Sequence, residues 1–268
     1  MLLSVDDLSI YCPTGPLVRN VSFDLDRNAC IGIVGESGSG KSLICHAVNG
    51  LLDESLTTSG RVTFDGKALF DETIAARRAL RGDSIAMILQ SPMTAFNPLF
   101  TIGNQAAETL RAHRGLSRRH ALDEMAEMFV RMRLKDPKRI FGRYPHELSG
   151  GMLQRIMIAF ATILEPDLLI ADEPTTAIDY ISQREVIEEL QKIRDEKATA
   201  IIFVSHDLSL VSHIADDVMV MEGGRCVEQG GTRQVFLAPK HGHTRYLIDS
   251  RKRLISGYSQ MMSTIDVA

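Results

Sequence analysis

Polar and hydrophobic residues alternate near the start of the chain, a pattern typical of half-buried strands. Residues 8–11 and 21–25 both follow this period of two. Between them stand Pro13, Gly15 and Pro16, residue types that favour loops. We therefore expect two strands joined by a loop, at the start of an antiparallel β subdomain.

Four other hydrophobic runs show no alternation, which favours parallel strands buried on both faces. They span residues 30–34, 85–89, 168–171 and 200–204. Between the second and third runs, apolar residues recur at helical spacing, as at Leu122, Met125, Ala126 and Phe129. A further helix is expected around Val186, Ile187, Leu190 and Ile193. This order predicts an α/β fold with a mainly parallel core sheet. We expect one domain over residues 1–250, with an inserted α-helical subdomain over 91–165, and a short C-terminal tail over 251–268.

The composition is that of an ordinary globular protein, with 268 residues, 44% of them hydrophobic and 24% charged. The net charge of −4 and the pI of about 6.1 give no reason to expect nucleic acid as a partner. The first seven residues carry acids and no long apolar stretch, so we expect no signal peptide. The cysteines show no paired spacing, and we expect small buried residues in a reducing compartment; they are Cys12, Cys30, Cys45 and Cys226.

Residues 84–107 contain no charged side chain, a length that could span a bilayer. Prolines and side-chain amides interrupt the stretch at Gln90, Pro92, Asn97, Pro98, Asn104 and Gln105. Because such groups are costly in lipid, we expect a strand followed by a structured polar loop. A membrane would then be reached only through partners.

A glycine-rich segment directly follows the apolar run 30–34 and precedes a predicted helix. Its spacing, Gly35-x-x-x-x-Gly40-Lys41-Ser42, is that of a P-loop. Glycines let backbone N–H groups turn toward phosphate oxygens, and the helix start adds a favourable dipole. Lys41 is expected to reach the β- and γ-phosphates, and Ser42 to hold Mg²⁺. The full set of expected contacts is Gly35, Glu36, Ser37, Gly38, Ser39, Gly40, Lys41, Ser42 and Leu43.

Two acids stand at the end of the apolar run 168–171. Asp172 can reach the Mg²⁺ of a neighbouring P-loop, and Glu173 can act as the general base toward an attacking water. A hydrophobic strand that ends in acids is common. Its position after a P-loop is what favours a nucleotide-hydrolysing site.

A third motif runs from Leu148 to Arg155, just before an apolar helical run. Ser149, Gly150 and Gly151 form a helix start suited to phosphate, although alone they would indicate only a serine-capped helix. After the P-loop and before the acids, this motif resembles the signature motif of ABC transporter ATPases. Smaller matches to that family are the Q-loop glutamine Gln90, the D-loop residue Asp179 (after Ile178, where leucine is usual), the switch histidine His206 and the adenine-stacking Tyr11.

The resemblance implies an ABC-type nucleotide-binding domain that binds ATP and Mg²⁺ and hydrolyses ATP. Mg²⁺ would be held by Ser42, Gln90 and Asp172, with Glu173, His206 and Gln90 as catalytic residues. ATP would lie between the P-loop of one subunit and the signature of a second homologous ATPase, identical or different, which contributes Ser149, Gly150, Gly151, Gln154 and Asp179. The other implied partners are integral membrane permease subunits and, indirectly, an extracytoplasmic solute-binding protein. The implied location is the cytoplasmic face of the inner membrane.

Residues 90–99 and 239–247 look like the corresponding strings of the peptide and nickel importer group, and Met152 with Leu153 is most similar to its nickel-importing members. No cysteine follows Cys226, whereas oligopeptide-type members usually carry a cysteine-rich tail. The resemblance therefore implies import of nickel, another metal chelate or a peptide. His241 and His243 are expected to be solvated and not metal-bound.

Two alternatives are weighed against this interpretation. A soluble ABC ATPase of DNA repair or translation usually carries coiled-coil or zinc insertions, for which the sequence has no heptad run or cysteine cluster. A small-molecule kinase would leave the 148–155 motif and His206 without a role.

Overall fold

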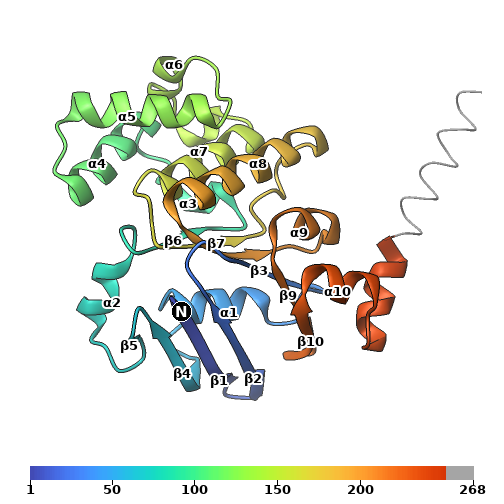
Figure 1. Ribbon diagram of the computed structural model, residues 1–268. Coiled ribbons are helices and arrows are strands. Elements are labelled where there is room, and N and C mark those ends of the chain that lie inside the picture. Colours follow the sequence, from blue (N-terminus) through green and yellow to red (C-terminus); the bar gives the residue numbers. More distant parts are fainter. Residues whose placement is uncertain (252–268) are drawn as a thin grey trace, which may run out of the picture.

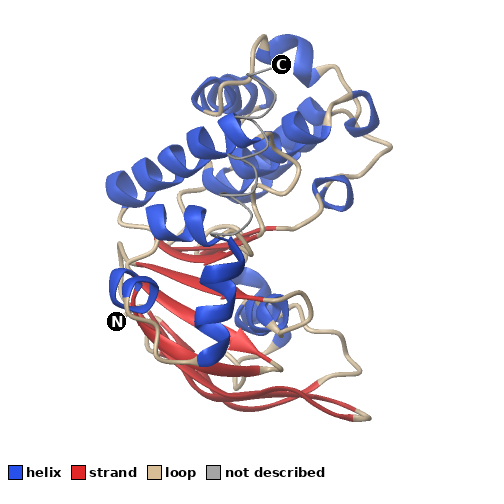
Figure 2. Cartoon of the chain, turned by 90° about the vertical axis from the view of Figure 1, so that its right-hand side faces the viewer, coloured by secondary structure: helices blue, strands red, loops and turns tan. Residues whose placement is uncertain are grey.

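Two sheets form the framework of the chain (Figure 1), as described by a computed structural model for residues 1–251, apart from the side chains of residues 180 and 181. One sheet has six strands in the order β10-β9-β3-β8-β7-β6, and the other has four in the order β2-β1-β4-β5. Figure 2 shows the sheets stacked on one side of the molecule and most helices on the other. The predicted tail over 251–268 lies outside the described residues except for its first residue.

The six-stranded sheet is parallel except for β10 at its edge. Its strands are β3 (Cys30–Gly35), β6 (Ile85–Ile88), β7 (Leu168–Asp172), β8 (Ala200–Val204), β9 (Asp217–Glu222) and β10 (Arg225–Gly231). β3, β7 and β8 are buried along their whole length, as their unbroken apolar runs predict. The mainly parallel core sheet is therefore confirmed, while β9 and β10 extend it beyond the prediction.

The antiparallel sheet consists of β1 (Leu3–Cys12), β2 (Gly15–Leu25), β4 (Thr57–Phe64) and β5 (Lys67–Ala68). The predicted loop around residues 13–16 is wrong in its extent. Gly15 and Pro16 belong to β2, where they pair with Cys12 and Tyr11. Because β2 is an edge strand, a proline without an N–H is tolerated there, and residues 13 and 14 alone form the turn.

A set of helices separates β6 from β7, as the helical spacing predicts. They are α3 (Pro92–Ala95), α4 (Ile102–Arg114), α5 (Arg118–Arg131), α6 (Pro137–Phe141), the 3₁₀ turn Pro145–Glu147 and α7 (Gly150–Thr162). The uncharged stretch begins as β6 and continues as a polar loop around α3. There the Asn97 N–H donates to the side-chain oxygen of Gln105 at 3.0 Å, and the Gln105 side-chain N–H donates to the Asn97 carbonyl oxygen at 3.1 Å. Within the described residues, no helix has both the length and the apolar character to cross a bilayer.

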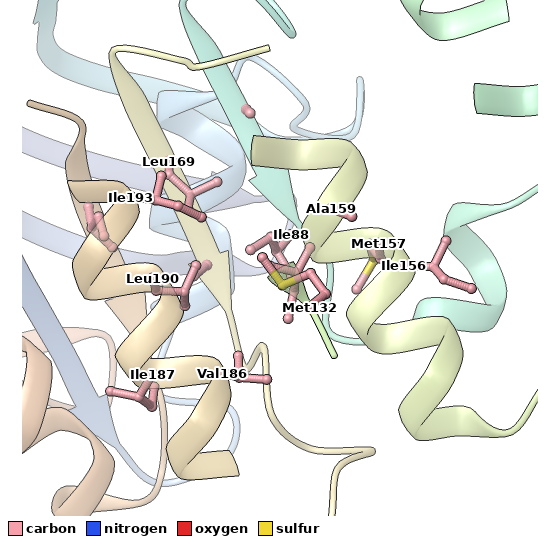
Figure 3. Close-up of a cluster of buried hydrophobic side chains, with 14 of the residues drawn as sticks. Ile88, Met132, Ile156, Met157, Ala159, Leu169, Val186, Ile187, Leu190 and Ile193 are labelled. Atoms are coloured by element: carbon pink, nitrogen blue, oxygen red, sulfur yellow. The ribbon is translucent and has the colours of Figure 1, made fainter. Parts of the chain in front are cut away.

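The remaining helices lie beside the two sheets. They are α1 (Lys41–Val48), α2 (Ile74–Leu80), α8 (Tyr180–Lys197), α9 (Leu208–Ile214), α10 (Thr232–Leu237) and a C-terminal helix over residues 242–251. Of these, α8 and α9 pack against the parallel sheet. Figure 3 shows Val186, Leu190 and neighbouring side chains of α8 facing Leu169 of β7. Of the four free cysteines, Cys30 and Cys45 are buried and the other two half-buried.

Candidate active site

The carboxyl ends of the parallel strands lie side by side along one end of the six-stranded sheet, which is called the carboxyl edge of the sheet. Ile33 of β3 pairs with Val204 of β8, which pairs with Asp172 of β7, and β6 continues the same register. The segments that follow these strands therefore leave the sheet together. These segments and the strand ends before them carry the P-loop, Asp172, Glu173, His206 and Gln90. This edge is where open α/β sheets bind their ligands.

The loop between β3 and α1 folds around its own lysine. The Nζ of Lys41 donates to the carbonyl oxygens of Gly35 at 2.9 Å and Glu36 at 2.7 Å, and lies 3.4 Å from Ser39 Oγ. Lys41 is buried, which lowers the pKa of its ammonium, while the charges of Glu173 and Asp172 oppose that change. The charge is thus held inside the loop, where a phosphate would offer better acceptors.

Two glycines of this loop are required by the backbone. A Cβ at Gly35 would lie 2.3 Å from the carbonyl oxygen of Met221, and Gly40 begins α1 with a φ of 99°. Behind Gly40, a Cβ would meet Val18 of β2 at 2.9 Å and Gly224 at 3.8 Å. The antiparallel sheet and the β9–β10 turn therefore support the loop, a contact that no sequence pattern indicated.

Asp172, the last residue of β7, is only 3% exposed. Burial raises the pKa of its carboxyl group, while a hydrogen bond from Ser42 and the charge of His46 lower it. Its Oδ1 is buried and has no hydrogen-bond partner in the described part of the chain. Buried polar atoms are normally paired, so a partner such as a hard cation fits this position.

Glu173 and His206 are in direct contact. Glu173 Oε2 lies 2.8 Å from Nδ1 of His206 and accepts a hydrogen bond from Thr176 Oγ1 at 3.0 Å. The Glu173 backbone has a φ of 49°, sparsely populated for a non-glycine residue, and its N–H donates to Val204 of β8 at 3.0 Å. The carboxylate is thus aimed by its backbone and by two side chains. Thr176 had no motif-based signal except its place in the D-loop.

Gln90 and Tyr11 stand at the border of this arrangement. Gln90 is exposed two residues after β6 ends. Tyr11 is 39% exposed on β1, and hydrogen bonds with Ser59 and Ser9 lower the pKa of its phenol. Both side chains are accessible to a ligand.

The signature segment lies elsewhere in the same chain. Ser149 begins α7 and accepts a hydrogen bond from the Met152 N–H at 3.3 Å. A Cβ at Gly151 would lie 3.3 Å from the carbonyl oxygen of Ala177, so this helix start borders the D-loop. Asp179 caps the start of α8, and hydrogen bonds from the Ser182 side chain and N–H lower the pKa of its carboxyl group.

Gln154 does not fit the ligand contact predicted for it. Its side chain is fully buried, and neither its amide oxygen nor its nitrogen has a partner among the described residues. One turn into α7, it lies behind the exposed helix start. Within this motif Ser149 and Gly150 are exposed to a partner, and Gly151 is half-buried.

The expectation of solvated C-terminal histidines is wrong for His243. Its side chain is 7% exposed, and Nδ1 lies 3.2 Å from Glu222 Oε1, whereas His241 is exposed. The cause is Glu228 of β10, whose carboxylate accepts the N–H groups of Lys240 and His241 at 2.8 and 2.9 Å. These bonds draw the segment onto the sheet.

Known proteins resemble this chain along nearly its whole length. The family described as ABC transporter matches residues 18–176. The chain is 42% identical to the metal-staphylopine import system ATP-binding protein CntD of Staphylococcus aureus, covering 92% of this chain and 91% of that protein. It is 41% identical to the dipeptide transport ATP-binding protein DppD of Bacillus subtilis, covering 94% and 77% of the two chains.

Solved structures agree on the fold. The cbiO1 structure from Clostridium perfringens, part of an ABC transporter complex, has a TM-score of 0.75 and 25% identity, covering 98% of both chains. The ATP-binding cassette MJ0796 in its dimeric post-hydrolysis state has a TM-score of 0.76 and 23% identity, covering 87% of this chain and 99% of the other. The chain therefore belongs to the ABC transporter family, as an ATP-binding subunit with the fold of an ABC ATPase.

Proposed function

We propose that this chain hydrolyses ATP to ADP and phosphate as the engine of a membrane importer. The observation that carries the proposal is the meeting of the P-loop, Asp172, Glu173 and His206 at one sheet edge. No other edge of the fold gathers a buried lysine, two carboxylates and a histidine in the described residues.

The P-loop is suited to the phosphates of ATP. Its N–H groups and the start of α1 offer a dipole and donors to an anion. Lys41 can exchange its bonds to the loop carbonyls for stronger bonds to phosphate oxygens. Tyr11, exposed on β1, is the proposed adenine-stacking side chain.

Mg²⁺ fits the oxygen atoms beside the P-loop. Asp172 has one oxygen without a partner, and Ser42 lies against the same carboxylate. Gln90, exposed at the same edge, is the third proposed ligand. Bound there, Mg²⁺ would neutralise charge on the β- and γ-phosphates.

Glu173 is the proposed general base. Its carboxylate would take a proton from a water whose oxygen bonds to the γ-phosphorus, while the bond from that phosphorus to the bridging oxygen breaks and ADP leaves. His206, 66% exposed beside it, is free to contact the γ-phosphate. Thr176 would hold the base in place.

A second ATPase subunit would complete the site. Ser149 and Gly150 lie at an exposed helix start, which favours binding of the phosphates of an ATP molecule held by a facing subunit. Asp179 borders the same surface. The negative charge of ATP, held between two helix starts and Mg²⁺, would join the subunits, and its loss would weaken that interface.

A groove beside Gln90 is suited to a permease subunit. It has a volume of about 360 Å³ and lies between β6, α3, α4 and α7, with Leu89, Phe96 and Phe160 in its lining. Apolar side chains are exposed on the same loop, with Met93 at 52% and Leu99 at 79%. A short cytoplasmic segment of a permease would bury these surfaces and hold this chain at the cytoplasmic face of the inner membrane. An extracytoplasmic solute-binding protein would act on the same permease.

The names of the relatives support a solute of a particular class. Metal-staphylopine and dipeptides are the cargo named for the two similar proteins. We propose that the solute here is nickel, another metal chelate or a peptide, passing through the permease and not through this chain.

Affinity purification of this chain from its native membranes, with mass spectrometry of what accompanies it, tests the proposal. Polytopic membrane proteins and a second ATPase are the expected companions. Recovery with ribosomes or DNA-repair proteins instead would contradict a role in transport and favour a soluble ABC ATPase.

A further inference from the structure

The C-terminal helix, residues 242–251, is anchored at its start to the β9–β10 hairpin (Figure 1, red). The Glu228 carboxylate accepts the N–H groups of Lys240 and His241, at 2.8 and 2.9 Å. Burial raises the pKa of Glu228, but these hydrogen bonds outweigh it and the net shift is downward. The segment that leads into the helix is therefore held by the half-buried carboxylate of Glu228.

The other end of this helix reaches the loop after β8. Arg251 Nη2 donates to Asp207 Oδ2 at 2.6 Å. Asp207 directly follows His206, and its Oδ1 accepts the Ser209 N–H at 2.9 Å, which caps α9. Each oxygen of this carboxylate thus has its own donor. The Asp207 side chain is 13% exposed, so solvent screens the ion pair less than it would at an open surface.

The position of His206 depends on this loop. Its side chain is 66% exposed, so packing contributes little to where the ring lies. The ring reaches Glu173 only if the backbone over residues 205–207 stays in place. The Asp207 N–H donates to Ser205 Oγ at 3.0 Å, and the Asp207 carboxylate ties the same backbone to α9 and to Arg251.

We infer that Arg251 is a positioning residue for ATP hydrolysis, acting through Asp207 to keep His206 against Glu173. This inference rests on the proposed roles of His206 and Glu173. Arg251 belongs to a segment far from the P-loop in the sequence, and among residues 1–251 its side chain forms its hydrogen bond with Asp207. Losing it should therefore slow the chemical step without weakening ATP binding.

The test compares Arg251→Gln, Arg251→Lys and the control Arg245→Gln in the full-length chain, within the complex in which it is purified. Arg245 is an exposed arginine of the same helix, and in the described part of the chain its side chain donates to the Lys240 carbonyl, at 3.0 Å. We expect Arg251→Gln to lower kcat on the order of tenfold, less than the roughly hundredfold that a 1 Å misplacement can cause. The Kd for a non-hydrolysable ATP analogue and the Tm should stay at wild-type values. Arg251→Lys should recover most of the activity, and Arg245→Gln should equal wild type.

Asp207→Asn removes the charge that pairs with Arg251 and keeps the cap of α9, because asparagine also caps helices. It therefore distinguishes loss of the ion pair from a general loss of structure. If the pair acts as a unit, the double variant with Arg251→Gln turns over no more slowly than the slower single variant. Additive losses, an unchanged kcat in Arg251→Gln, or a loss that follows a lowered Tm would each overturn the inference. His206→Ala separates a failure of the proposed role of His206 from a failure of the inference about Arg251. Wild-type turnover in that variant would refute the proposed role of His206, whereas its loss beside an active Arg251→Gln would refute the role of Arg251 alone.

Discussion

Replacing Glu173 by glutamine removes the proposed general base and keeps the shape of the site. Glutamine has the same size, and its carbonyl oxygen can still accept from Thr176 Oγ1 and His206 Nδ1, which lie 3.0 and 2.8 Å from the present carboxylate. The unusual backbone at this position, with a φ of 49°, makes no demand that only glutamate meets. We therefore expect the same fold and a loss of basicity alone.

The size of the loss in turnover can be estimated because the substitution removes only the basicity of Glu173. A positioned general base contributes about 10²- to 10⁴-fold in rate. At about 1.36 kcal/mol for each factor of ten, this corresponds to about 2.7–5.4 kcal/mol of activation free energy. ATP binding should not weaken, because Lys41 and the loop N–H groups are unchanged and one negative charge near the phosphates is removed.

The assay measures phosphate release at saturating ATP and, separately, the Kd for ATP. Size-exclusion chromatography with ATP should show the variant retained in a closed pair of ATPase subunits. Glu165→Gln is a suitable control, since Glu165 lies before β7, at the opposite end of that strand from Glu173, and pairs with Lys197 at 2.8 Å. Turnover by Glu173→Gln within about threefold of wild type would refute the assignment of the base.

Lys41→Ala should weaken ATP binding by about 10- to 100-fold, because charged hydrogen bonds to phosphate are lost, and calorimetry that finds an unchanged Kd would contradict this. Asp172→Asn should abolish Mg²⁺-dependent turnover yet raise the Tm in metal-free buffer at pH 7. Burial raises the pKa of Asp172, so its ionised form destabilises the fold at neutral pH, and the gain should shrink as the pH falls toward about 4; a lower Tm at pH 7 would be the opposite result. Phe129→Ala should reduce the free energy of unfolding by about 3–5 kcal/mol, because the ring is fully buried and lies 5.3 Å from that of Phe141. The neighbouring Val130→Ala, at a side chain 63% exposed, should change it by less than about 0.5 kcal/mol, and equal losses in chemical denaturation would contradict the assignment of the core.

The parallel sheet was predictable because its central strands are buried on both faces. β8 begins and ends where its apolar run does, and β7 extends one residue further to Asp172. The positions of the motifs at strand ends then determine which edge carries the site. β9 also contains a buried apolar run, from Val218 to Met221, which is the same sequence signal of a buried strand.

Other features depend on contacts between distant segments. Pro16 lies in a strand because β2 is at a sheet edge, and His243 is buried because Glu228 binds the N–H groups just before it. Gln154 follows the signature glycines, yet helical rotation turns its side chain into the core. The Arg251–Asp207 pair joins residues 44 positions apart. Local patterns contain no information on such pairings.

The fate of the γ-phosphate tests the central claim most directly. The purified chain, with the membrane proteins that accompany it, is given ATP labelled in the γ-phosphate, with and without Mg²⁺. We predict that the label appears as inorganic phosphate, only with Mg²⁺, and that release falls when the membrane partners are removed. Label transferred to a small-molecule acceptor, or no release in the intact complex, would contradict an ATPase that drives transport.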